Sequence, residues 1–174
     1  MTIEPSLLAI APQDPVTLLA LTAIGEAGGQ GYNGMQAAIN SIINRVAGGG
    51  WAESTIQDVC LAKDQYDCWQ PGVDRDRILS LVPSDPVYQQ AMTLAKLAVS
   101  GVLPDITGGA DSFCSVNREE PAWAKAEGAA MKVQINEYKF YATWPKLPRV
   151  DHLPSVSEAQ DPEPAPVSVP STPE

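Results

Sequence analysis

Glu26 is the residue whose type and setting most clearly suggest chemistry. It is the only charged residue in LTAIGEAGGQGYNG, residues 21–34, where it follows an apolar run and precedes a cluster of glycines. A carboxyl at the end of an apolar helix is partly desolvated and faces the negative end of the helix dipole, and both effects raise its pKa. A glutamate that stays protonated near neutral pH can donate a proton to a glycosidic oxygen. The alternative is a solvated glutamate at a frayed helix end, because glycine commonly ends helices.

Conventional two-acid glycoside cleavage also needs a second carboxylate. Asp64, Asp67 and Asp111 are the candidates in predicted loops, and the alternative for each is a turn or surface residue. A single acid/base can still cleave muramyl sugars if no partner is in place. It protonates the leaving oxygen and then deprotonates the sugar's own 6-hydroxyl, which closes on the anomeric carbon. The product of that route carries a 1,6-anhydro ring rather than a reducing end.

Histidine-based catalysis is excluded because the sequence holds one histidine, His152, at the start of a Pro-rich tail. Zinc amidases need several His or Cys ligands, and cysteine peptidases and serine triads need a histidine base. We therefore expect carboxylates to transfer the protons, with no metal or other cofactor. Cys60, Cys68 and Cys114 fit no metal spacing. They are interpreted as buried free thiols, with a Cys60–Cys68 disulfide in an oxidising compartment as the alternative.

Charge and hydropathy exclude several classes of partner. The 174 residues carry a formal net charge of −10, and residues 151–174 contribute acids but no Lys or Arg. Because an acidic surface repels phosphate backbones, we expect no nucleic-acid partner. No apolar run reaches the roughly 20 residues of a membrane span, and the N-terminus lacks the basic region of a secretory signal. We expect a monomer that does not insert into membranes and is cytoplasmic at synthesis.

The elements that must position Glu26 are mostly helical. Apolar periodicity predicts helices over 14–29, capped by Asp14, over 32–50, capped by Asn33, and over 84–101, capped by Asp85. Weaker elements are a short helix over 53–63 capped by Ser54 or Thr55, a possible helix in 121–130 and a hairpin over 132–143. Residues 63–77 and 102–122 are predicted to be loops. The fold class is therefore mainly α with a small β-hairpin (α+β). An extension over 1–13 precedes a single domain over 14–145, and a Pro-rich, acidic tail over 146–174 is predicted to be disordered.

Several stretches resemble one known family. TAIGEAGGQGYNGMQAAINSIINRV resembles the opening motif of the SleB-type cell wall hydrolases, the spore-cortex-lytic enzymes and their phage relatives. STIQDVC, DQYDCW, GGADSFCSVN, and PAWA with VQINEYKFY match later motifs of that family in order, so the resemblance spans about residues 17–141. It implies a lysozyme-like domain, related to goose-type lysozymes and lytic transglycosylases. It also implies cleavage of the N-acetylmuramic acid–N-acetylglucosamine bond in peptidoglycan glycan strands.

Carried over residue by residue, the resemblance makes Glu26 the catalytic acid/base. It implies that Asn44 and Arg45 brace the helix behind Glu26 rather than touch substrate. The side chains expected to bind the saccharide are Gln65, Tyr66, Trp69, Ser112, Phe113 and Trp123. For the two tryptophans, a half-buried core position is the alternative to a sugar platform.

The sequence departs from the family pattern at three places. Ile24 replaces the tyrosine before Gly-Glu, and Gln30 replaces a second glutamate, which removes one candidate partner for Glu26. Residues 112–114, Ser-Phe-Cys, stand where His-Tyr-Tyr is usual. These changes affect the predicted subsites and leave the acid in place.

Three functions fit these observations. The first is a lytic transglycosylase or muramidase that acts in lysis or wall remodelling, such as a phage endolysin. The second is a non-catalytic lysozyme-like module for wall binding or virion structure, which the low basic charge and the altered 112–114 stretch favour slightly. The third is ordinary hydrolysis with Asp64 or Asp111 as the second carboxylate.

Overall fold

The helix α2, Pro15–Ala27, is the element around which the other helices pack. The computed structural model describes residues 3–48 and 55–143. The other elements are α1 (Pro5–Leu8), η1 (Gly28–Gln30), α3 (Gly31–Gly48), α4 (Ile56–Leu61), η2 (Asp67–Trp69), α5 (Val73–Leu79), α6 (Pro86–Val99), β1 (Ser112–Ser115), η3 (Ala122–Lys125), β2 (Ala130–Ile135) and β3 (Tyr138–Ala142), where η marks a 3₁₀ turn. The predicted tail over 146–174 lies outside the described residues.

Local chemistry sets the start and the burial of α2. The Asp14 carboxylate accepts a hydrogen bond from the Thr17 N–H at 2.8 Å, and Pro15 occupies the first helical position, as predicted. Almost every residue from Leu18 to Ile24 is buried, so α2 is apolar on all sides and forms the centre of the core. It ends at Ala27, with Gly28 as the C-cap.

The helices α3 and α6 follow the predicted apolar stripes with two differences at their starts. α3 begins at Gly31, two residues before the predicted cap Asn33, because η1 leads directly into it. Asp85 occupies the cap position of α6, but its carboxylate accepts from the Val82 N–H at 2.9 Å instead of from the first helical turn. The cap of α4 is confirmed at Thr55, whose hydroxyl accepts from the Asp58 N–H at 3.1 Å.

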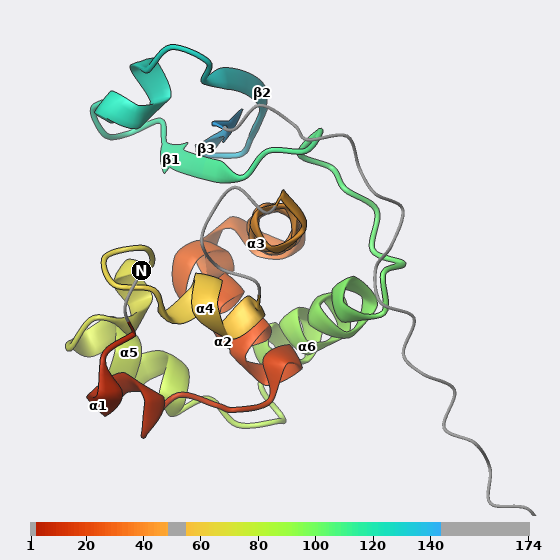
Figure 1. Cartoon of the computed structure of the whole chain (residues 1–174). Coiled ribbons are helices and arrows are strands. Elements are labelled where there is room, and N and C mark those ends of the chain that lie inside the picture. Colours follow the sequence, from red (N-terminus) through yellow and green to blue (C-terminus); the bar gives the residue numbers. More distant parts are fainter. Residues whose placement is uncertain (1–2, 49–54, 144–174) are drawn as a thin grey trace, which may run out of the picture.

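The predicted hairpin is confirmed as β2 and β3, and a third strand completes the sheet. The order is β1-β3-β2, all antiparallel, with Phe113 of β1 opposite Phe140 of β3. Asn136 adopts a left-handed φ of 51° in the tight turn. In Figure 1 the sheet lies on one side of α3 and the other helices lie on the opposite side. Residues 102–122 were predicted to be irregular, and this was wrong for β1, whose four residues do not alternate in polarity.

The segment 63–77 was predicted to be a loop, but it contains η2 and the start of α5. Tyr66, Cys68 and Trp69 of this segment are buried in the same cluster as α2, so the segment is part of the core rather than a surface connection. No described helix is long and apolar enough to cross a membrane. All three cysteines are free thiols: Cys60 and Cys68 are buried as expected, and Cys114 is partly exposed.

Candidate active site

Glu26 lies in the last turn of α2 and is half-buried. One carboxylate oxygen, Oε1, accepts a hydrogen bond from the backbone N–H of Cys68 at 3.1 Å. Burial is the largest cause that raises the pKa of Glu26, and the bond from Cys68 opposes it. The nearby carboxylates of Asp67 and Asp74 raise the pKa further. Glu26 therefore holds its proton to a higher pH than a solvated glutamate, as a general acid must.

The turn η2 is held against α2 by contacts of Trp69 and Cys68. The indole N–H of Trp69 donates to the Thr22 hydroxyl at 3.0 Å, one helical turn before Glu26. A Cβ built on Gly25 would lie 2.4 Å from the Cβ and 2.7 Å from the Sγ of Cys68. Only glycine at position 25 leaves room for this approach. Gly25 thus leaves the space into which η2 packs, and the next residue, Glu26, carries the carboxyl that η2 contacts.

The hairpin closes the other side of this helix end. The Tyr138 hydroxyl donates to the Glu26 carbonyl oxygen at 2.9 Å. At the tip, the Asn136 side-chain amide donates to the Gln30 carbonyl at 2.8 Å, and the Gln30 side-chain amide donates to Glu137 at 3.0 Å. Gln30, which replaces the family's second glutamate, thus anchors the hairpin beside Glu26.

Asn44 and Arg45 hydrogen-bond other segments of the protein. The Asn44 amide donates to the Ala110 carbonyl at 2.9 Å, just before β1. The Arg45 guanidinium donates to the Gln65 side-chain oxygen at 2.9 Å and to the Ser112 hydroxyl at 3.4 Å. Arg45 thereby ties β1 and the segment before η2 to α3.

Replacing Arg45 with alanine is expected to lower the free energy of unfolding by about 2–4 kcal/mol, because it leaves buried polar partners unsatisfied. Urea denaturation of the purified protein measures this. The matched control is Arg77→Ala, since Arg77 forms an exposed ion pair with Asp74 at 3.6 Å and should contribute at most about 0.5 kcal/mol. Equal losses in the two variants would show that Arg45 is not a structural brace.

Three of the predicted saccharide-binding residues are buried and present no surface for a sugar. Tyr66 is 3% exposed, with the Arg45 guanidinium 5.6 Å from its ring centroid. Trp69 is 2% exposed because its ring packs in the core and its N–H bonds Thr22. Ser112 is 4% exposed and its hydroxyl donates to Asp111 at 2.9 Å. These assignments are corrected to core positions, which for Trp69 was the alternative interpretation.

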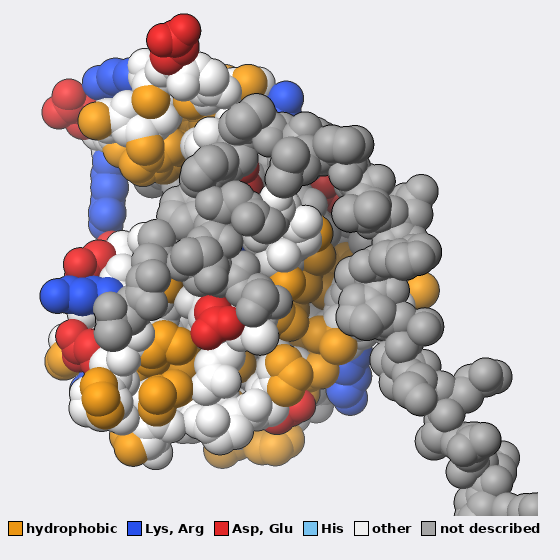
Figure 2. Space-filling model, viewed as in Figure 1, with side chains coloured by type: hydrophobic (Ala, Val, Ile, Leu, Met, Phe, Trp, Pro, Cys, Tyr) orange, Lys and Arg blue, Asp and Glu red, His pale blue; other side chains and the backbone are white. Residues whose placement is uncertain are grey.

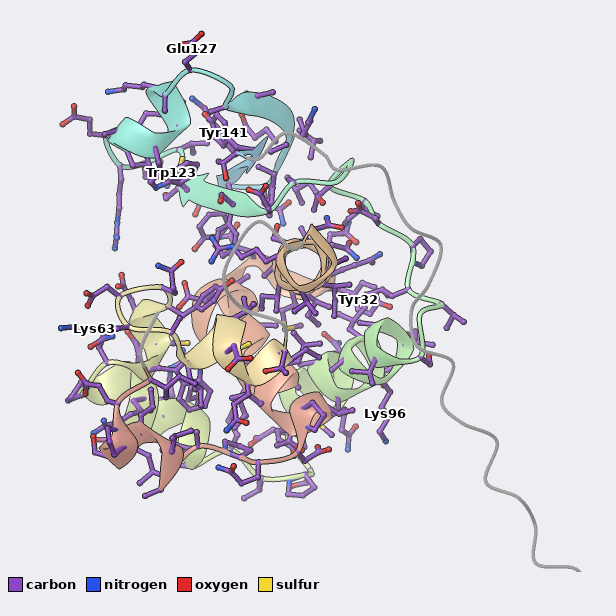
Figure 3. The ribbon with its side chains drawn as sticks, in the orientation of Figure 1. Tyr32, Lys63, Lys96, Trp123, Glu127 and Tyr141 are labelled. Atoms are coloured by element: carbon purple, nitrogen blue, oxygen red, sulfur yellow. The ribbon has the colours of Figure 1, made fainter. Side chains whose placement is uncertain are left out.

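The other three predicted residues are accessible to different degrees. Gln65 and Phe113 are partly buried, and the Phe113 ring packs edge-on against Tyr138 with centroids 5.4 Å apart. Trp123 is 38% exposed and packs edge-on against Tyr141 at 5.5 Å, on the far side of the sheet from α3 (Figure 3). Phe113 thus contacts Tyr138, the residue whose hydroxyl bonds the Glu26 carbonyl.

A notch separates the sheet from the helices on one face of the molecule, and a basic side chain crosses it (Figure 2). An ion pair joins Arg118, which follows β1, to Asp67 of η2, with 3.9 Å between the nitrogen and the oxygen. It links the sheet side of the molecule to the helix side. Asp67 directly precedes Cys68, the residue that bonds the Glu26 carboxyl. Gly29, on the exposed side of the same helix end, would place an added Cβ more than 4 Å from other atoms. The helix end that carries Glu26 is therefore open on its glycine side.

The three candidates for a second carboxylate differ in their surroundings. Asp67 is close enough to raise the pKa of Glu26, and so is Asp74, which the sequence reasoning missed. Asp64 is exposed in a left-handed turn with φ 61°. The Asp111 carboxylate is buried and accepts from the backbone N–H and the hydroxyl of Thr143. Within residues 3–48 and 55–143 no cluster of His, Cys, Asp and Glu could hold a metal ion.

Comparisons with known proteins agree on one kind of protein. A family model described as Cell Wall Hydrolase matches residues 29–141. The chain is similar to the catalytic domain of the Bacillus cereus SleB protein, with TM-score 0.56 and 19% identity over 75% of this chain and 91% of that one. It is equally similar to the catalytic domain of the germination-specific lytic transglycosylase SleB from Bacillus anthracis, with TM-score 0.56 and 21% identity over 74% and 94%. No curated protein matches the sequence.

These matches confirm the α+β fold and leave Glu26 to be argued from its surroundings. The family match begins at residue 29, after the glutamate. At 19% and 21% identity, the similarity to the two solved domains concerns the fold. The role of Glu26 therefore depends on its burial, its hydrogen bond and its position at an open helix end.

Proposed function

The chain belongs to the Cell Wall Hydrolase family, and we propose that it cleaves peptidoglycan glycan strands at the N-acetylmuramic acid–N-acetylglucosamine bond, with Glu26 as acid/base. The observation that carries this proposal is the half-buried Glu26 carboxyl, whose pKa is raised by burial and which is held by a single backbone N–H. The reaction would serve lysis or wall remodelling.

We propose that the enzyme acts as a lytic transglycosylase rather than as a hydrolase with two catalytic carboxylates. Glu26 first protonates the oxygen of the bond between the two sugars, so that the leaving sugar departs with a hydroxyl. The resulting Glu26 carboxylate then takes the proton of the muramic acid 6-hydroxyl, whose oxygen bonds the anomeric carbon and closes the anhydro ring. Glu26 ends protonated, so atoms and charge balance and no water is consumed.

The surroundings of the neighbouring carboxylates favour this route. A second catalytic carboxylate must face the reacting carbon or its attacking water at a set separation from the acid. The Asp67 side chain is 89% exposed and pairs with Arg118, and the Asp74 side chain is 70% exposed and pairs with Arg77. Both contribute charge that keeps Glu26 protonated, and neither is held rigidly toward it.

The function is tested by incubating the protein with purified, insoluble peptidoglycan and separating the pellet from the supernatant. We expect soluble muropeptides to increase with time. The alternative, a non-catalytic wall-binding or virion module, predicts protein in the pellet and no released fragments. That outcome would overturn the proposal.

The rate of release is expected to fall as the pH rises through the pKa of Glu26. Only the protonated carboxyl can donate to the leaving oxygen, and burial places this loss at a higher pH than for an ordinary glutamate. A pH–rate profile of muropeptide release measures the alkaline limb. A limb at the ordinary glutamate pKa would contradict the assignment of a desolvated acid.

A further inference from the structure

We propose that Cys68 is the positioning residue for the Glu26 carboxyl, an inference that rests on the proposed function. The backbone of Cys68 fixes one carboxylate oxygen, and its side chain fills the space that would otherwise admit water beside the carboxyl. The thiol forms no bond with substrate in this role.

The first part of the argument is the hydrogen bond to the carboxyl. The Cys68 N–H donates to Glu26 Oε1 at 3.1 Å. The Cys68 thiol is a second hydrogen-bonding partner of the same carboxyl. The direction of this N–H depends on how η2 sits on α2. Trp69 fixes one end of the turn through its hydrogen bond to Thr22. The packing of the Cys68 side chain against α2 therefore determines the direction of the Cys68 N–H.

The second part is the fit between the Cys68 side chain and Gly25. The Cβ and Sγ of Cys68 occupy the volume just outside the Cα of Gly25, where an added Cβ would lie 2.4 and 2.7 Å away. The Sγ also lies 4.0 Å from the carbonyl oxygen of Thr22, one turn before Glu26. Cys68 is 2% exposed. The Cys68 side chain, a weak donor that also hydrogen-bonds the Glu26 carboxyl, thus fills the space between η2 and α2 beside that carboxyl.

The chemistry of the sulfur agrees with a positioning role. Burial and the nearby Glu26 carboxylate raise the pKa of the Cys68 thiol, so it stays protonated. A buried, neutral thiol is a poor nucleophile but a good apolar filler. Cys60 offers a matched comparison, because it is 1% exposed and its pKa is raised to about 12, yet it does not hydrogen-bond Glu26.

Other titratable groups face Glu26 from the elements packed around it. They are Asp67 on η2, Asp74 on α5, Tyr138 on β3, Cys60 on α4, and Tyr66 just before η2. A substitution at Cys68 leaves all five in place. A change in the titration of Glu26 in such a variant therefore reports on Cys68 itself.

The test is a direct titration of Glu26 by ¹³C NMR of the carboxyl carbons, with the signal assigned by its absence in Glu26→Gln. We compare wild type with Cys68→Ser and Cys68→Ala, and with Cys60→Ser as the matched control. Serine donates more strongly to the carboxylate than the thiol does and also attracts water, so Cys68→Ser should lower the pKa of Glu26 by at least about half a pH unit. Alanine opens space for water, which lowers the pKa, but it also removes the thiol's hydrogen bond to the carboxyl, which raises it. Because burial is the largest cause of the raised pKa, Cys68→Ala should still lower it, by less than Cys68→Ser does.

Cys60→Ser should leave the titration of Glu26 unchanged. An unchanged pKa in the Cys68 variants, or an equal shift in Cys60→Ser, would overturn the proposal. If Cys68→Ser does not fold, Cys68→Ala supplies the same comparison. The titration uses no substrate, so a wild type that releases no muropeptides contradicts the proposed function separately from this result.

Discussion

Glu26→Gln is expected to slow the release of muropeptides by about a hundredfold to ten-thousandfold, the range typical for loss of a general acid. Glutamine keeps the shape of the side chain and can still accept from the Cys68 N–H, but its amide is not acidic enough to protonate the leaving oxygen. Binding to insoluble peptidoglycan should survive the substitution. The measurement is the initial rate of fragment release, with cosedimentation as the binding assay.

The stability of Glu26→Gln provides a check on folding with a definite sign. Because the pKa of Glu26 is raised in the folded state, the folded protein binds the proton more tightly than the unfolded chain. Its contribution to stability is present below the ordinary glutamate pKa and is lost as the pH rises through the raised value. At neutral pH the melting temperature of Glu26→Gln should therefore equal or exceed that of wild type.

The matched control is Glu127→Gln, an exposed glutamate on the sheet side of the molecule (Figure 3). It should leave both the rate and the melting temperature unchanged. A loss of activity in Glu127→Gln as large as that in Glu26→Gln would mean that total charge, rather than an acid at position 26, determines the rate.

Gly25→Ala is expected to displace η2 and to lower the rate of release by at least about tenfold. Helix propensity alone favours alanine by about 1 kcal/mol. The added Cβ, however, would lie 2.4 Å from the Cβ of Cys68, which is not a flexible chain end. Overpacking of this kind costs about 1–3 kcal/mol, so steric conflict should outweigh propensity. The Cys68 N–H then moves away from the Glu26 carboxyl.

Gly29→Ala is the control for this substitution. Gly29 is exposed, and a Cβ there would meet nothing within 4 Å. Its melting temperature should match wild type, while that of Gly25→Ala should fall. The measurements are the melting temperatures of both variants and the rate of release by Gly25→Ala. A Gly25→Ala protein as active as wild type would contradict the close packing of η2 against Gly25.

Elements with local signals could be predicted from the sequence. The Asp14 cap with Pro15 fixed the start of α2, and the turn at Asn136 between alternating apolar residues identified the hairpin. Both depend on interactions between residues near each other in the chain. The raised pKa of Glu26 was also predicted, from its place at the end of an apolar helix, although the distant segments η2 and β3 complete its surroundings.

Long-range contacts account for what could not be predicted. Trp69 and Tyr66 are aromatic residues of the type that binds sugar rings, but both rings lie in the core. Trp69 bonds Thr22, and the Arg45 guanidinium lies over the Tyr66 ring. The strand β1 pairs with β3 across more than 20 residues of intervening chain. No local pattern in a Gly- and Asp-rich segment signals that pairing.

The role of Gly25 was also hidden in the sequence. Beside Glu26 it looks like one more glycine in a helix-ending cluster. In the structure it provides the notch that admits Cys68, a residue 43 positions later in the chain. The fit between Gly25, which has no side chain, and the distant Cys68 can be recognised only in the folded structure.

The most direct test of the central claim is mass spectrometry of the muropeptides released from purified peptidoglycan by wild type and by Glu26→Gln. The proposed mechanism predicts fragments ending in 1,6-anhydro-N-acetylmuramic acid from wild type and essentially none from Glu26→Gln. Reducing-end fragments, heavier by one water, would contradict the transglycosylase route and require a second carboxylate. Equal release of anhydro fragments by both proteins would contradict the assignment of Glu26 as the acid/base.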